Sequence, residues 1–505
     1  MEGQPAPTPT PTGTSGTAGV VVLPPVVTDT STLPPAVTGA AARAGSGLLS
    51  VWVPVGCGGL TAALLALWCF RALRRRRRGL PPPAHAIMRT GAAATASLLL
   101  AVVTVAAGVN VYAGYLPTLS SAARFITGDR SARVTNNNTT VAALAAVGSG
   151  GCGSGRDRGW QLHDTRLPAD PGLRIARRQV IVATPPGYDS CHRDYPTLYV
   201  FPGSPGKAND WFETGHVTSV IDALVAQHLS PFYVVVAPDV NGGYLADSET
   251  LDAAGGSHVE TWVTRDVVRA VELDYRVRRD RADRVLAGMS SGGFAAVNLL
   301  FRHQDEFSIG LGMEPYGDPG NVTDRLLAGD IGLLHANSPN YYVPYLPLHR
   351  RLAVYLDVGT GTGEVPALRN LAQEIAQRHE AVTFRLENGQ KHSWTEATRG
   401  LPYALAFAAQ HLDQPGLRDT LPVSAFPTSH RTAQSLILSQ DFGASRARHF
   451  HCVLLRRLAP LAAHPVTLPG YCLPRSPRPE QIPRPTVRPG RRGGGAPTPV
   501  GHASR

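Results

Sequence analysis

Two long stretches rich in apolar residues lack charged residues. The first is the 23-residue run Leu48–Phe70, and the second is Gly91–Ala123. At 1.5 Å per residue the first run spans roughly 34 Å as a helix, which is enough to cross a bilayer. Buried helices of soluble proteins seldom run this long without a charge, and the first run is unlike a signal peptide because its positive charges follow it. We therefore expect residues 48–123 to form two transmembrane helices.

The loop between the two uncharged runs is rich in arginine. It holds Arg71, Arg74–Arg78 and Arg89, and positively charged loops stay on the cytoplasmic side. We therefore expect a multi-pass protein of the cell membrane, with the residues after about 124 outside the cytoplasm. Cys57 and Cys69 fall in the first run. The exported cysteines can form disulfides in three pairings, which the sequence leaves open: Cys152, Cys191, Cys452 and Cys472.

The rest of the chain lacks the basic surface that nucleic-acid binding requires. The net charge of +11 is carried by the arginine loop and by a tail from Gly416 that holds thirteen arginines, no lysine and three acids. What remains is slightly acidic, which argues against a nucleic-acid partner.

Both ends of the chain lack the alternation of apolar and polar residues that a core needs. Residues 1–47 are Pro/Thr-rich and residues 414–505 are Pro/Arg-rich, so we expect both to be largely disordered. The tail holds histidines and cysteines, but at a spacing that fits no metal site: His449, His451, Cys452, His464 and Cys472. We expect neither a metal nor a cofactor.

Between a Gly/Asn/Ser/Arg-rich linker at 124–164 and the tail, residues 165–413 alternate between strand-like and helix-like patterns. Short apolar runs typical of buried strands lie at 178–184, 197–203, 232–238, 284–290, 307–313, 351–359 and 382–388. Periodic helix-like segments separate them. This alternation predicts an α/β domain with a mostly parallel sheet that is covered by helices on both faces.

The sharpest chemical signal is Gly288-Met289-Ser290-Ser291-Gly292. In an α/β-hydrolase, G-x-S-x-G forms the tight turn between a strand and a helix and exposes the serine as a nucleophile. Here a strand-like run precedes the motif and the helix-like GGFAAVNLLF follows it. The helix dipole then stabilises negative charge that develops at Ser290.

A serine nucleophile needs a base and an acid, which follow it in the order acid, then histidine. His392 lies in a loop after the strand-like run 382–388 and is the candidate base. For the acid, Asp357 and Glu364 compete at the end of the preceding run. We prefer Glu364, because the Gly-rich loop before it can fold the carboxylate back toward the histidine.

Two backbone N–H groups must stabilise the oxyanion. One belongs to the residue after the nucleophile, here Ser291. The other comes from the loop after an early strand, where Pro202-Gly203-Ser204-Pro205 fits. Since Pro205 has no N–H, Ser204 is the candidate donor.

The segment 165–413 resembles the esterase family that includes the antigen 85 mycolyltransferases. Four segments carry the resemblance: VETWVTRDVVRAVE, GMSSGGFAA, AVYLDVGTGTGE and NGQKHSW. It implies an α/β-hydrolase fold, no cofactor, and a triad of Ser290, Glu364 and His392. One departure is the oxyanion loop, which lacks the family's Asp-Gly-Leu-Arg stretch and so argues against mycolyl transfer to trehalose.

The function expected from the sequence is hydrolysis of a carboxylic ester, or transfer of an acyl group other than an amino-acyl group, at the cell envelope. The substrate is then a small-molecule or lipid acyl ester. The rival interpretation is a non-catalytic envelope protein that uses the hydrolase shell for binding or scaffolding. The sequence leaves the oligomeric state open.

Overall fold

The structure is a computed structural model of the 505-residue chain. It describes residues 27–28, 31–42, 47–79, 86–129, 131, 133–134, 140, 142–143, 146, 159–243, 246–412 and 414–418. These residues form a helical hairpin and an α/β domain. Of the tail that was expected to be largely disordered from 414 to 505, residues 414–418 are described and include the short helix Pro415–Arg418. The rest of that tail, with its histidines and cysteines, lies outside the described residues, as does most of the expected linker.

The hairpin consists of α2 (Trp52–Arg77) and α3 (Ala86–Ala113), which pack against each other. By length and composition, Trp52–Arg77 and Thr90–Ala113 are candidate membrane spans, and neither is buried inside the protein. Apolar side chains such as Trp52 and Phe70 are 75 % and 60 % exposed. Such exposure is unfavourable in water and is expected of surfaces that face lipid.

The lack of charge from Gly91 to Ala123 suggested one continuous helix, but the structure has two helices in this run. The chain leaves α3 at Gly114, which adopts φ +68°, and a new helix, α4 (Leu119–Thr127), begins after Thr118. Thr118 accepts a hydrogen bond from the backbone of Ser121 at 3.1 Å, and the Ser121 hydroxyl accepts one from the backbone of Thr118 at 3.0 Å. A glycine turn followed by a capping box thus interrupts a segment whose lack of charge looked continuous.

The α/β domain is built on a nine-stranded sheet in the order β1-β9-β8-β7-β6-β4-β5-β3-β2. Its strands are β1 (Val27–Thr28), β2 (Gln161–Leu167), β3 (Arg178–Thr184), β4 (Thr197–Phe201), β5 (Val234–Pro238), β6 (Arg284–Met289), β7 (Ile309–Met313), β8 (Ala353–Gly359) and β9 (Ala381–Glu387). Only the β2–β3 and β3–β5 pairs are antiparallel among these strands. The expected mostly parallel sheet is therefore confirmed.

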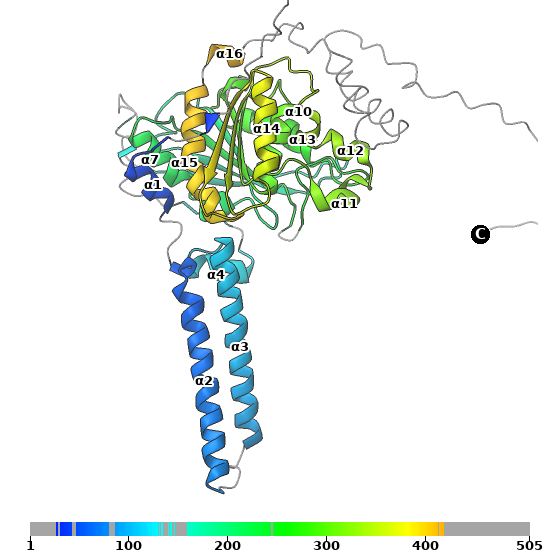
Figure 1. Ribbon diagram of the computed structural model, residues 1–505. Coiled ribbons are helices and arrows are strands. Elements are labelled where there is room, and N and C mark those ends of the chain that lie inside the picture. Colours follow the sequence, from blue (N-terminus) through cyan, green and yellow to red (C-terminus); the bar gives the residue numbers. More distant parts are fainter. Residues whose placement is uncertain are drawn as a thin grey trace, which may run out of the picture. The chain divides into compact units, whose positions relative to one another are not determined.

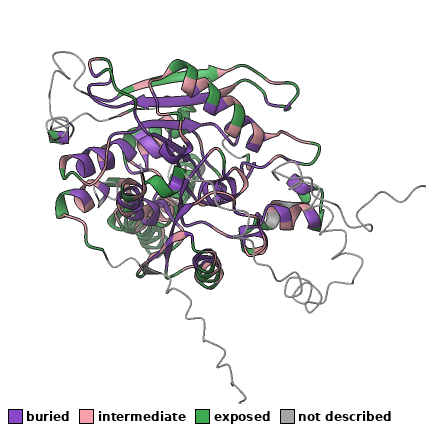
Figure 2. Ribbon diagram, turned by 90° about the horizontal axis from the view of Figure 1, so that it is seen from above, coloured by how far each residue is buried: buried purple, intermediate pink, exposed green. Residues whose placement is uncertain are grey.

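Helices lie on both faces of this sheet (Figure 1). On one face α1 (Pro35–Ala42), α7 (Val217–Ala226) and α15 (Trp394–His411) contact one another, and on the other α10 (Ser291–Arg302), α13 (Pro339–Tyr342) and α14 (Val365–Gln377) do so. The strands between them are almost wholly buried (Figure 2). Shorter helices are α6 (Asp210–Glu213), α8 (Val259–Thr261), α9 (Val268–Asp274), α11 (Thr323–Leu327), α12 (Ile331–Ala336) and α16 (Pro415–Arg418), with a π-helix at Trp262–Val267.

Part of the N-terminal tail, expected to be disordered throughout 1–47, belongs to this domain. Residues 27–28 pair with β9 in parallel as an edge strand. In α1, Val37 and Ala41 are buried, one helical turn apart, and the helix packs on α7 and α15. The composition of residues 1–47, rich in proline and threonine, predicted disorder for the whole segment. Two apolar residues on one face of a short helix are nevertheless enough for that helix to pack on a larger apolar surface.

Close packing at the turn between β6 and α10 explains the two glycines of the serine motif. A Cβ atom on Gly288 would lie 2.0 Å from the carbonyl oxygen of Gly292, and one on Gly292 would lie 2.2 Å from the carbonyl oxygen of Phe201. Both distances are far inside van der Waals contact with backbone that cannot move aside. Glycine is therefore required at both positions by the approach of neighbouring backbone.

We predict that Gly292→Ala strongly destabilises the α/β domain. The added methyl group forces β4 and α10 apart, and overpacking of this kind typically costs about 1–3 kcal/mol of the free energy of unfolding. Thermal unfolding of the full chain in detergent, followed by tryptophan fluorescence, measures the loss. Gly363→Ala is the matched control, because a Cβ there meets nothing within 4 Å. Equal midpoints for the two variants would contradict the packing argument.

Candidate active site

Ser290 lies at the carboxyl end of the central strand β6, immediately before α10. Its backbone adopts φ 59° and ψ −122°, a conformation that is strained for a residue with a side chain. The strain is held by hydrogen bonds on both sides: the Ser290 N–H donates to the carbonyl of Met313 at 3.1 Å, and the Phe294 N–H donates to the Ser290 carbonyl at 2.9 Å. The side chain is thereby presented at the amino end of a twelve-residue helix.

His392 reaches Ser290 from the loop between β9 and α15. Its Nε2 lies 2.8 Å from the Ser290 Oγ, a hydrogen-bond distance, although the two residues are 102 positions apart. The neighbouring carbonyl of Gln390 accepts a hydrogen bond from the Gly361 N–H at 2.8 Å, so the histidine loop is tied to the Gly-rich loop after β8. The imidazole is 38 % exposed and thus open to a substrate. The structure therefore brings together the two residues that the sequence named as nucleophile and base.

The carboxylate nearest to His392 is Glu314, which the sequence analysis did not single out. Glu314 follows β7 directly, and its Oε2 lies 3.6 Å from the His392 Nδ1. The side chain has no exposed surface, and its Oε1 accepts a hydrogen bond from the Gly359 N–H at 2.9 Å. Its Oε2 has no hydrogen-bond partner among the described residues. A buried carboxylate with one free oxygen aimed at an imidazole can orient the ring and stabilise its cation.

Glu314 left only a weak signal in the sequence. A lone glutamate at the end of the apolar run 307–313 resembles the polar residue that ends any buried strand. The stronger signal is its position: the carboxyl ends of β6 and β7, which are parallel neighbours, place Ser290 and Glu314 at the same edge of the sheet. The backbone of Glu314 is also at φ 47°, outside the usual range for a residue of this kind.

Glu364, the acid that the sequence favoured, stands at the N-cap of α14. Burial raises the pKa of its carboxyl, and the negative charge of Asp318 acts in the same direction, whereas His392 lowers it. Glu364 is thus within electrostatic range of the imidazole. It makes no ion pair with His392 in the part of the chain that the structure describes.

Asp357, the competing acid, has a different partner. It lies within β8 with no exposed side-chain surface, and the Arg385 Nη1 donates to both of its oxygens at 3.0 and 3.1 Å. The carboxyl of Glu396 lies beside it, where burial and the charge of Asp357 raise the pKa of Glu396 well above its usual range. Neither oxygen of Glu396 has a hydrogen-bond partner among the described residues. The ion pair of Asp357 with Arg385 fills the interior under α15, and the described residues show no ion pair between Asp357 and His392.

The candidate oxyanion donors lie on either side of Ser290. Ser291 is the first residue of α10, where backbone N–H groups have no partner within the helix. Across from it runs the loop after β4: a Cβ on Gly203 would lie 3.2 Å from the Ser290 Cβ, and Ser204 follows as a half-buried residue. The loop that carries Ser204, the second candidate donor, thus passes close to the nucleophile.

Two side chains hold this oxyanion loop in place. The Asn241 Nδ2 donates to the carbonyls of Gly203 and Gly206, each at 3.2 Å. The buried Asp210 accepts from the backbone N–H of Lys207 at 2.9 Å. Burial raises the pKa of Asp210 to about 7, and hydrogen bonds from the Lys207 backbone and from Tyr115 oppose that rise. Asn241 was not identifiable from sequence, because the carbonyls that it binds are 38 and 35 residues away and only the fold brings them near.

Metal and disulfide chemistry can be stated only for part of the chain. Within the described ranges no group of three or more His, Cys, Asp or Glu side chains is arranged to hold a metal ion. Cys191 is disulfide-bonded, and Cys57 and Cys69 are free thiols. The other three cysteines lie outside the described residues.

Comparison with known proteins gives one family match and several more distant likenesses. Residues 176–413 match the family described as "Putative esterase". An uncharacterized protein of Corynebacterium glutamicum is 26 % identical over 168 residues, which make up 32 % of this chain and 39 % of that protein. The aligned part is therefore well under half of this curated relative's length.

Solved structures that are similar to this chain have low sequence identity to it. A ferulic acid esterase is 23 % identical with a TM-score of 0.44, covering 50 % of this chain and 98 % of its own. An S-formylglutathione hydrolase from Agrobacterium tumefaciens is 16 % identical with a TM-score of 0.42, covering 50 % of this chain and 95 % of its own. The esterase family match covers residues 176–413, just under half of the chain, and the mostly parallel α/β sheet agrees with it.

Proposed function

We propose that this protein is a membrane-anchored serine esterase or acyltransferase that acts on carboxylic esters through Ser290, His392 and a buried glutamate. The observation that carries the proposal is the 2.8 Å contact between the His392 Nε2 and the Ser290 Oγ at a strained strand–helix turn. A serine hydroxyl is a poor nucleophile alone, and a neutral imidazole at hydrogen-bond distance is what activates it. The match of residues 176–413 to the esterase family supports the same chemistry.

In the proposed reaction Ser290 attacks the ester carbonyl while His392 takes its proton. The oxyanion that forms is stabilised by the N–H groups of Ser204 and Ser291 and by the amino end of α10. His392 then returns the proton to the leaving alcohol, which leaves an acyl group on Ser290. A water molecule or a second alcohol, deprotonated by His392, attacks the acyl group and restores the free serine.

The acid of the triad is proposed to be Glu314. When His392 takes the proton, the imidazolium needs a negative partner at Nδ1, and the free Oε2 of Glu314 is the atom that lies there. Its 3.6 Å separation exceeds a hydrogen bond, but catalytic contacts in unliganded sites are often long and shorten when substrate binds. Glu364, which the sequence favoured, remains the competing candidate, because the electrostatic interaction with His392 lowers the pKa of its carboxyl.

The identity of the acyl acceptor separates an esterase from an acyltransferase. The oxyanion loop carries Ser204 and Pro205 beside Ser290, and these residues supply no charged clamp for a sugar. Lys207 is the nearest cation along the loop, but its Nζ donates to the carbonyl of Asp129 at 3.3 Å. We therefore favour water as the acceptor. The products formed from a labelled acyl ester, with and without an alcohol such as trehalose, distinguish the two reactions.

The rival function is a binding or scaffolding domain that retains the shell of a hydrolase. Such a domain has no reason to keep a serine in a strained backbone conformation, because strain costs stability and persists where function requires it. The strained backbone of Ser290 therefore favours catalysis over scaffolding.

We predict that Ser290→Ala lowers hydrolysis of p-nitrophenyl butyrate by at least about 10⁴-fold, because removal of the nucleophile ends covalent catalysis. The initial rate of p-nitrophenol release by the full chain in detergent measures this loss. A thermal midpoint equal to that of the wild type shows that the variant is folded. Residual activity above one hundredth of the wild-type rate would exclude Ser290 as the nucleophile.

We predict that Glu314→Gln is far more damaging than Glu364→Gln or Asp357→Asn. A glutamine amide at position 314 can donate to the His392 Nδ1 and so favour the tautomer with the proton on Nε2, which cannot accept from Ser290. Loss of the acid in such a triad lowers kcat by up to about 10⁴-fold. The kcat values of the three variants decide between the candidates: a larger loss in Glu364→Gln would restore the acid named from the sequence.

The catalytic domain is proposed to lie outside the cytoplasm. The arginine-rich turn of the hairpin favours a cytoplasmic position for that turn, and a disulfide at Cys191 is typical of an exported domain. We predict that a cysteine placed at Arg76 resists an impermeant thiol reagent in intact cells, with Cys57 and Cys69 replaced by serine. Labelling of that cysteine before the cells are opened would contradict the proposed orientation.

A further inference from the structure

The segment that joins α3 to the α/β domain has two distinct faces. It comprises Gly114–Thr118, the helix α4 (Leu119–Thr127) and residues as far as Ser131. One face is polar and makes contacts with the loops of the candidate active site. The other is apolar and exposed.

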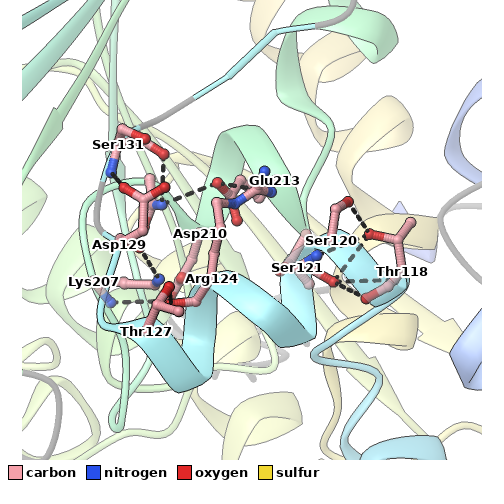
Figure 3. Close-up of polar contacts among 12 residues, drawn as sticks. Thr118, Ser120, Ser121, Arg124, Thr127, Asp129, Ser131, Lys207, Asp210 and Glu213 are labelled. Carbon is pink, nitrogen blue, oxygen red and sulfur yellow. Dashed lines mark hydrogen bonds and ion pairs between the residues drawn. The ribbon is translucent and has the colours of Figure 1, made fainter.

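The inner face of α4 is fixed to the domain by polar contacts (Figure 3). Arg124 forms an ion pair with Glu213 of α6 at 3.1 Å, and both side chains are largely shielded from water. The Lys207 Nζ donates to the carbonyl of Asp129 at 3.3 Å, directly after the helix. Arg124, the only cation of α4, is therefore directed inward, toward α6, and does not face outward.

Tyr115 connects this segment to both loops of the site. Its hydroxyl donates to the Asp210 Oδ1 at 2.9 Å, while the other oxygen of Asp210 holds the backbone of Lys207. Its carbonyl accepts from the Thr214 hydroxyl at 2.9 Å. Its ring lies 6.5 Å from that of Trp394, two residues after His392.

The last turn of α3 touches the histidine loop itself. The Lys391 ammonium lies 5.6 Å from the centre of the Tyr112 ring. Gly114 is packed so closely on Thr395 that a Cβ would lie 2.4 Å from the Thr395 hydroxyl. The candidate span ends at Ala113. The contacts of Tyr112 with Lys391 and of Gly114 with Thr395 therefore place the histidine loop beside the end of that span.

The outer face of α4 has no covering element among the described residues. Leu119 is 76 % exposed and Ile126 is 82 % exposed, and they lie two helical turns apart on one side with Ala122 and Ala123 between them. No charged side chain lies on this face. Only five residues separate it from the end of the candidate span, so a bilayer that contains α3 ends beside this face.

We propose that the outer face of α4 lies in the interfacial layer of the bilayer that holds α2 and α3, and that the site takes acyl esters which reside in that layer. The proposal rests on the proposed esterase function. An amphipathic helix with one apolar face is suited to the headgroup region, where that face is removed from water. Asp129 and Tyr115, on either side of α4, contact Lys207 and Asp210 at the oxyanion loop. Contact of α4 with the bilayer therefore fixes the site beside the ester groups of amphiphilic substrates.

The first test compares two esters with the full chain in phospholipid nanodiscs. One is water-soluble p-nitrophenyl acetate, and the other is a fluorogenic long-chain ester, 4-methylumbelliferyl palmitate, dissolved in the nanodisc. In Leu119→Ser/Ile126→Ser we expect hydrolysis of the palmitate to fall at least 10-fold and hydrolysis of the acetate to change less than 2-fold. Leu273→Ser/Ile331→Ser is the matched control, because it makes the same chemical change at residues that are 70 % and 45 % exposed away from α4.

The second test is spectroscopic and does not depend on activity. An environment-sensitive nitrobenzoxadiazole probe is attached to Ile126→Cys or Leu273→Cys, with Cys57 and Cys69 replaced by serine. In nanodiscs we expect blue-shifted, stronger emission at position 126 and water-like emission at position 273. Water-like emission at both positions, or an equal loss on both esters in Leu119→Ser/Ile126→Ser, would overturn the proposal. If the wild type hydrolyses neither ester, the proposed esterase function fails, and the probe still decides whether α4 contacts the bilayer.

Discussion

The candidate site depends on one contact between two distant loops, the 2.8 Å hydrogen bond between the Ser290 Oγ and the His392 Nε2. The bond exists because β6 and β9 run parallel in one sheet, so that the loops after them meet at its carboxyl edge. The Ser290 backbone has to remain strained to present the hydroxyl. Gly288 and Gly292 make this possible by letting the neighbouring backbones approach more closely than any side chain would allow. Packing and chemistry are thus specified by the same five-residue turn.

Several carboxylates of the domain are buried, and their partners distinguish those with a structural role from the one proposed to act in catalysis. Asp357 is paired with Arg385, while burial and the neighbouring negative charge raise the pKa of Glu396. A buried carboxylate paired with a guanidinium, such as Asp357, is what buried ionisable groups normally show. Glu314 differs, since one of its oxygens is bound by the Gly359 N–H and the other is left to His392. A carboxylate held ready in this way can stabilise a cation that forms only during the reaction.

The sequence predicted the fold class and the meeting of Ser290 with His392, because both follow from local patterns: apolar strands alternating with helices, and a glycine-framed serine before a helix. It did not indicate Glu314, whose importance comes from strand adjacency, a property of the sheet order. It likewise missed α1 and the break at Gly114. The first depends on docking against α7 and α15, and the second on a turn within a segment whose uniform lack of charge suggested one continuous helix.

Reaction of the full chain with a fluorophosphonate tests the central claim most directly, because this reagent phosphonylates only a serine that is activated by a neighbouring base. The account predicts a single adduct, located by peptide mass spectrometry on Ser290, and much slower labelling in His392→Ala. Absence of an adduct on the folded wild type, or an adduct on Ser291 with Ser290 unmodified, would contradict it.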